Sequence, residues 1–249
     1  MKKKLLLIMP FTLAFVMVFA AFAVGCGGGI SRGGGGGERM ADEEAWLAAI
    51  ENSWEQLARY DRNMIWTQET RVEERADRNN HSTVAGSQRT VFNGDLIRQG
   101  NTFWEFNEVR GGLRRYWRIE RDPRGNYRRH ETTWRPRLHN IDIVEEFDFE
   151  FFDFSRGRHV FNADRYIESL RAEHAEMAVE RGAAWADENP FEPPWGDDDR
   201  VVFEVTIRDG LITNLYVHSR LAALGMTTEM RTTIEWDRTE NITLPEIDE

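Results

Sequence analysis

The chain has 249 residues and a formal net charge of −11, with 43 acidic against 32 basic residues. This acidic balance argues against binding to nucleic acid and against attachment to anionic lipid through a basic surface, because like charges repel. Cys26 is the only cysteine, which excludes an intrachain disulfide and a cysteine-based metal site.

The first 26 residues have the order of an export signal. Three lysines at positions 2–4 precede an apolar run from Leu5 to Val24, and Gly25 and Cys26 follow. A segment of this kind is removed from the mature protein. The run is also long enough to span a bilayer as an uncleaved anchor. Pro10 and the glycine-rich exit favour cleavage, which leaves the mature chain three charges more negative.

The sequence Ala23-Val24-Gly25-Cys26 resembles the lipobox of bacterial lipoproteins, with Ala23 where Leu is usual. The resemblance implies cleavage between Gly25 and Cys26 and a diacylglycerol on the Cys26 thiol, with palmitate among its expected acyl chains. Two acyl chains suffice for stable attachment. The mature chain is therefore expected on the outer face of the cytoplasmic membrane or on the outer membrane.

Three segments follow from this reading: a signal peptide at 1–25, a lipidated tether at 26–38 and one folded domain at 39–249. The tether has eight glycines between Gly27 and Gly37, a composition typical of flexible coil. The remaining length fits one domain with a hydrophobic core.

Asp42 to Tyr60 is predicted to be a helix with Asp42 as its N-cap. Apolar residues at three- and four-residue steps form one stripe along it: Trp46, Ile50, Trp54 and Leu57.

From Met64 the apolar residues alternate with polar ones, which predicts antiparallel strands. Turn residues separate them at Asn93-Gly94, Gly100-Asn101 and 122–126. The predicted strands cover 64–71, 82–92, 96–99, 102–106, 113–119 and 127–134.

The second half starts with alternating phenylalanines at 147–151, which predict a strand with a bend near Phe151-Phe152. A second helix is predicted from Asn162 or Asp164 to near Gly182. A surface loop covers 187–199. Three strands follow within 201–236, and the chain ends in an extended segment at 241–246.

The order of elements is a helix, several strands, a second helix and three more strands. This order predicts an α+β fold: a curved antiparallel sheet, or half-barrel, with two main helices covering its concave side. This layout resembles the LolA/LolB and LppX-like superfamily of bacterial lipoproteins. The similarity covers the lipobox, the leading helix, the strand–turn–strand pattern of Val202–Leu215 and the terminal Ile242-Thr243-Leu244-Pro245. It implies a curved sheet with helices at its mouth, and several members hold lipid there. It implies no catalytic residues.

The aromatic residues on the strands either form an ordinary core or line an apolar pocket, as ligand sites often do. The predicted lining is Trp66, Trp104, Trp117, Phe203, Met230 and Trp236. We therefore expect the protein to bind or carry a lipid-like or other apolar ligand. The alternative is an envelope structural or protein-interaction module that binds no small ligand. A metal- or carboxylate-dependent hydrolase is a minor alternative.

No motif in the sequence indicates an enzyme. Phosphate-binding loops, dinucleotide fingerprints, HExxH and GxSxG elements are missing. The six histidines lack metal-ligand spacing, and 197–199, three consecutive aspartates, lack the spacing of a calcium loop. We expect a non-enzymatic protein without cofactor or metal.

The lipobox resemblance predicts that Cys26→Ala leaves an unprocessed precursor, because the acylated thiol is the substrate of cleavage. Metabolic labelling with a fatty acid and the mass of the purified chain measure both steps. Normal labelling and cleavage of the variant would refute the anchor.

Overall fold

The protein is described by a computed structural model that covers residues 37–59, 62–75, 81–136, 141–196 and 198–247. The chain divides into two compact units, Met1–Arg39 and Met40–Glu249, and all the described strands lie in the second. Gly25, Cys26 and the tether to residue 36 lie outside the described residues. Helix α2, Gly37–Ala58, contains most of the predicted first helix and begins within the last two residues of the predicted tether.

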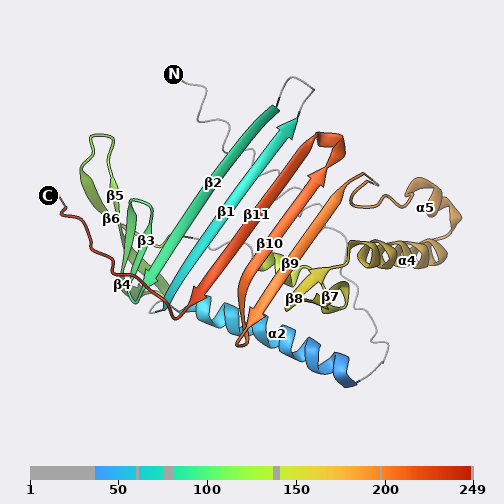
Figure 1. The fold of residues 1–249 in the computed structure, drawn as a ribbon, viewed down its shortest axis with the longest axis horizontal. Coiled ribbons are helices and arrows are strands. Elements are labelled where there is room, and N and C mark those ends of the chain that lie inside the picture. The colour runs from blue at the N-terminus through green and yellow to red at the C-terminus, as the bar shows by residue number, and fades with distance from the viewer. Residues whose placement is uncertain (1–36, 60–61, 76–80, 137–140, 197, 248–249) are drawn as a thin grey trace. The chain divides into compact units, whose positions relative to one another are not determined.

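Eleven antiparallel strands form one open sheet in the order β6-β5-β4-β3-β2-β1-β11-β10-β9-β8-β7 (Figure 1). Its two halves join where β1 pairs with β11, from Met64 opposite Trp236 to Glu74 opposite Met226. The α+β class and the large antiparallel sheet are thus confirmed. The strands are β1 Asn63–Arg75, β2 His81–Asn93, β3 Leu96–Gln99, β4 Thr102–Arg110, β5 Leu113–Arg121, β6 Tyr127–Thr132, β7 Phe152–Ser155, β8 Arg158–Phe161, β9 Arg200–Arg208, β10 Leu211–Leu221 and β11 Met226–Trp236.

Two-residue turns join several strands, as their residues predict. Asp209 and Gly210 both have positive φ, 52° and 71°, which matches the twist of the flanking strands β9 and β10. The turn after β2 is shifted by one residue from the prediction. Asn93 pairs with Leu96 as the last residue of the ladder, so Gly94 and Asp95 form the turn.

One side of the sheet, here the helix face, carries Met64, Trp66, Phe92, Trp104 and Phe203 and packs against α2. Three residues of the predicted stripe are buried in this contact: Trp46, Ile50 and Leu57. The Trp46 ring contacts the Phe152 ring in a tilted arrangement, with centroids 4.6 Å apart. The Ser53 hydroxyl accepts a hydrogen bond from the Ile212 backbone N–H at 3.0 Å, which fixes α2 at the β9–β10 end of the sheet.

The opposite side, here the strap face, has an apolar patch of its own formed by Ile65, Val91, Phe103 and Ile119. Residues 238–247, here the C-terminal strap, form no strand and lie over this patch (dark red in Figure 1). Ile242, Leu244 and Ile247 of the strap pack against it. The extended conformation predicted for 241–246 agrees with this arrangement.

Glu240 fastens the strap to β2 and β3. Its carboxylate accepts two hydrogen bonds from the Arg89 guanidinium, at 2.5 and 2.8 Å, and one from Arg98 at 3.1 Å. These contacts, Arg89 first, lower the pKa of Glu240. A carboxylate with a lowered pKa in the folded state stabilises that state at neutral pH. Its contribution is lost as the pH falls through the lowered pKa.

The strand predicted at 147–151 is wrong. The chain there forms a short helix α3, Asp142–Glu145, and a 3₁₀ turn η1, Phe149–Phe151, before β7 begins at Phe152. Phe147, Phe151 and Phe152 are all buried. One straight strand would place Phe151 and Phe152 on opposite faces. The 3₁₀ turn lets both reach the interior, and it occupies the position of the predicted bend.

The second helix, α4 Ala163–Arg181, begins and ends where the sequence predicts. The Asn162 side chain accepts a hydrogen bond from the Arg165 backbone N–H, and Gly182 follows the last turn with φ 90°. No residue of α4 is buried, however. Its neighbours are the short helix α5, Ala183–Glu188, and the 3₁₀ turn η1, where Phe151 contacts the Tyr166 ring. Helix α5 starts before the predicted loop, and a second turn of 3₁₀ helix, η2 Ala222–Leu224, links β10 to β11.

The strap should contribute measurably to stability. Ile242→Ala removes a buried side chain and should lower the free energy of unfolding by about 2 kcal/mol or more. Leu224→Ala, at a residue 63% exposed, is the control and should change it by less than about 0.5 kcal/mol. Urea denaturation of the two variants measures the difference, and equal effects would show that the strap does not cover a core.

Candidate functional site

The structure does not gather the six predicted lining residues into one pocket. Trp66, Trp104, Phe203 and Met230 lie on the helix face with exposed fractions of at most 4%. Trp236 lies on the same face and donates its indole N–H to the Ile212 carbonyl at 2.8 Å. Trp117 belongs to the other face, because Trp104 pairs with residue 118, and Arg129 lies 4.5 Å from its ring.

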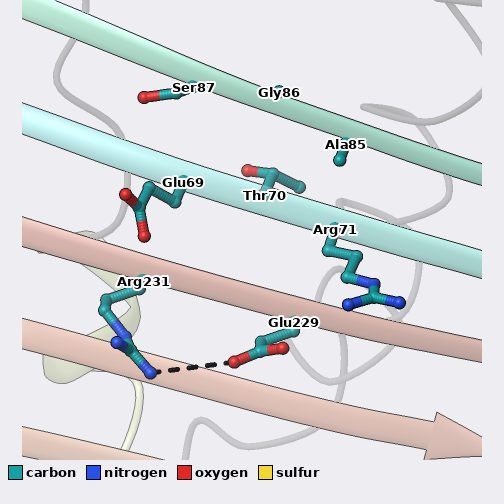
Figure 2. A pocket seen from close by; sticks show the side chains of 8 residues that line it. All are labelled: Glu69, Thr70, Arg71, Ala85, Gly86, Ser87, Glu229 and Arg231. Atoms are coloured by element: carbon teal, nitrogen blue, oxygen red, sulfur yellow. Dashed lines mark ion pairs between the residues drawn. The ribbon is translucent and has the colours of Figure 1, made fainter.

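An open depression of about 480 Å³ lies over β1, β2 and β11, and we call it the polar depression. Figure 2 shows Glu69 and Arg71 on β1 between small residues of β2 and two charged residues of β11. Its lining is Glu69, Thr70, Arg71, Ala85, Gly86, Ser87, Glu229 and Arg231.

The depression exists because β2 carries small side chains where the neighbouring strand β1 and the next strand β11 carry long ones. Glu69 pairs with Ser87 on one side and Arg231 on the other, and Arg71 pairs with Ala85 and Glu229. The side chains of β2 do not fill the space that the long side chains of β1 and β11 border. A Cβ added at Gly86 would meet no atom within 4 Å.

Charges of both signs line the depression. Arg231 and Glu229 lie 3.8 Å apart, and Arg71 pairs at 2.5 Å with Glu73, its neighbour on the same strand. Among the described residues Glu69 has no cation within ion-pair distance. The depression therefore offers a carboxylate to a basic group of a ligand.

Tyr216 extends this polar surface onto β10. Its ring lies beneath the Arg231 guanidinium, 5.4 Å from ring centre to guanidinium carbon. Burial raises the pKa of the Tyr216 phenol, and the Glu229 carboxylate, which accepts its hydrogen bond, raises it further. Tyr216 therefore stays protonated at neutral pH and serves as a hydrogen-bond donor rather than as a nucleophile.

A second ion pair continues the polar surface toward the β7 edge. Glu204 is the cross-strand partner of Tyr216, and it pairs with Arg158 of β8 at 2.5 Å. Polar side chains thus run from β1 to β8 on this side of the sheet. The arrangement suits recognition by charge and hydrogen bonding.

Asp199, in the segment of three consecutive aspartates at 197–199, has a role other than calcium binding. Its carboxylate accepts backbone hydrogen bonds from Gly196 at 2.8 Å and Ala222 at 2.6 Å. Asp197 lies outside the described residues. Within the described ranges, no three His, Cys, Asp or Glu side chains are grouped to hold a metal ion.

In the part of the chain that the structure describes, the helices are too short or too polar to cross a membrane. The sequence matches no family model and no curated protein. The function therefore has to be inferred from the geometry.

The polar depression was not predicted from the sequence, which indicated only a strand at 82–92. The available signal was Ala85-Gly86-Ser87, three small residues in the middle of a long strand. Small residues in a strand often mark a place where another group approaches the backbone closely. The charges opposite them depend on register, which the sequence does not reveal.

The contact between Tyr216 and Glu229 makes a testable prediction. In the wild type the Tyr216 phenol should titrate above its ordinary value near 10. Glu229→Gln should lower that pKa, because the neutral amide no longer disfavours the phenolate. Carbon-13 NMR of labelled tyrosine, assigned with Tyr216→Phe, measures it. Glu246→Gln, in the strap, is the control, and an equal shift in both variants would contradict the contact.

Proposed function

We propose that this protein is a lipid-anchored envelope protein that binds a protein partner through the polar depression. Its acyl chains on Cys26 hold it on the outer face of the cytoplasmic membrane or on the outer membrane. The glycine-rich tether gives the domain reach and freedom to rotate. The partner contributes a basic group that meets Glu69.

The observation that carries this proposal is the contrast between the buried aromatic side chains of the sheet and the open polar depression. The large aromatic side chains Trp66, Trp104 and Phe203 are packed in the interior. The polar depression is open, of a size common for ligand sites, and four of its eight lining residues are charged. Such a lining matches the mixed charges of a protein surface better than an acyl chain.

Binding rather than catalysis is the proposed activity. Burial and Glu229 keep the Tyr216 phenol protonated, and Glu229 lies beside Arg231. A general base needs a carboxylate or imidazole free to accept a proton within reach of a nucleophile. Charge pairing at Glu229 disfavours proton transfer there, and Glu69, unpaired among the described residues, is the carboxylate that we assign to the partner's basic group.

A carrier of a lipid-like ligand is the second candidate, and one feature of the helix face favours it. Helix α2 is fixed at Ile212, whereas Leu221 lies nine residues further along β10, about 30 Å away. A helix is only about 10–12 Å wide. Past α2 the same face carries Val72 and its cross-strand partner, the half-exposed Val84, beyond the polar Gln68 and Thr70 of β1. In this candidate the sheet curves into a half-barrel, and α2 and α4 cover its concave side.

Photo-crosslinking in native membranes distinguishes the two candidates. A photoreactive residue at Ser87, inside the depression, should give one protein adduct of defined mass. Glu69→Lys should abolish this adduct, because the reversed charge repels the partner's basic group. Glu180→Lys, on exposed α4, makes the same change in net charge and should leave the adduct intact.

Two outcomes would contradict the partner proposal. Adducts that survive Glu69→Lys, or that form equally from a probe at Val179 on α4, would show that the depression is not the binding surface. Native mass spectrometry of the full chain tests the carrier: a stoichiometric lipid that survives purification, together with no adduct from Ser87, would favour it.

A further inference from the structure

Three arginines from distant parts of the sequence meet at the C-terminal end of α2. Arg62 precedes β1, Arg114 lies in β5 and Arg135 follows β6. All three donate hydrogen bonds to the consecutive backbone carbonyls of 57–59, with Arg135 at 3.1 Å from the Leu57 oxygen. We call these residues the arginine cluster.

The cluster concentrates positive charge in a buried place. Arg62 is only 4% exposed, and its guanidinium lies 4.0 Å from the centre of the Phe92 ring. Burial first, then the charges of Arg135 and Arg114, lower the pKa of Arg62 to about 9. Among the described residues no carboxylate lies within ion-pair distance of Arg62 or Arg135. A buried charge without a counter-charge is costly.

Capping of the helix accounts for only part of the arrangement. Cations do stabilise the carbonyl end of a helix. A guanidinium, however, has five N–H donors, and the Nε of Arg62 has no acceptor. The buried Tyr116 hydroxyl, close enough to influence the Arg62 pKa, also has no hydrogen-bond partner among the described residues. The site therefore contains buried polar groups that the described residues leave unsatisfied.

We propose that the arginine cluster, together with the Tyr116 hydroxyl, binds a phosphate-type oxyanion. Such an ion carries negative charge, which Arg62 and Arg135 do not meet in a carboxylate among the described residues, and it has several acceptor oxygens. The planar guanidinium fork matches phosphate oxygens in pairs. Arg114 and Arg135 are half-exposed, so the anion approaches from the solvent side of the cluster. The source is either free phosphate or the phosphate of a lipid headgroup.

This site is separate from the polar depression and does not depend on the proposed protein partner. Arg62 directly precedes β1, Arg114 lies in β5 and Arg135 follows β6, whereas the depression lies over the middle of β1 and over β2 and β11. Either assignment can fail without the other.

Thermal unfolding of the full chain in detergent tests the proposal. Sodium phosphate is titrated at an ionic strength held constant with sodium chloride. At 100 times the dissociation constant, phosphate should raise the wild-type Tm by about 5 °C or more. Arg135→Gln should weaken phosphate binding at least tenfold, as seen in the concentration needed for the same shift. Arg124→Gln, in the exposed β5–β6 turn, should bind phosphate like the wild type.

A short-chain phosphatidylglycerol below its micellar concentration separates the two sources. Binding at least tenfold tighter than inorganic phosphate assigns the site to a lipid headgroup, and weaker binding assigns it to free phosphate. The matching diacylglycerol, which lacks phosphate, should not bind in an Arg135-dependent way.

The proposal is overturned if phosphate and chloride change the wild-type Tm equally. Asp61 precedes Arg62 in the sequence and lies outside the described residues, so Asp61→Asn is included. If only this variant responds to phosphate, the Asp61 carboxylate is the counter-charge and no external anion is required. Failure of Arg135→Gln to weaken phosphate binding overturns the assignment of the cluster as well.

Discussion

The architecture depends on one constraint: both faces of the sheet carry apolar side chains around β1 to β5, so both need a cover. Met64 and Phe92 point to the helix face, while their neighbours Ile65 and Val91 point to the strap face. Helix α2 packs against the helix face. The strap face is covered by a segment without ladder hydrogen bonds, which explains why side-chain contacts of Glu240 hold the C-terminal strap in place.

Most strands and both long helices could be predicted because alternation and helical periodicity are local properties of the sequence. The strand predicted at 147–151 was an exception, and the other failure depended on which face of the sheet a side chain occupies. Leu113, Trp117 and Ile119 share a face, but pairing of Trp104 with Arg118 places that face opposite Trp104. Register of this kind comes from neighbouring strands, so a one-residue difference moves a side chain across the sheet.

Two-sided burial did leave a signal in the sequence. Consecutive apolar pairs such as Val91-Phe92 and Phe103-Trp104 interrupt the strict alternation of a half-buried strand. Such runs are typical of strands buried on both faces. They indicate that a second cover exists without showing which segment supplies it. The candidate sites were less predictable still: the arginine cluster joins residues more than seventy positions apart, and the polar depression depends on three paired strands.

The charge of the domain constrains what can reach the arginine cluster. The chain is acidic overall, so an extended anionic surface such as a bilayer is repelled as a whole. Salt screens charges beyond about 8 Å at physiological ionic strength, however, and the cluster acts within a few ångströms. A small ion or a single headgroup therefore experiences mainly the three guanidinium groups. An anionic membrane surface is also repelled by the acidic domain as a whole. The same distinction separates the two sites: we propose that the polar depression recognises an arrangement of charges and that the arginine cluster recognises one anion.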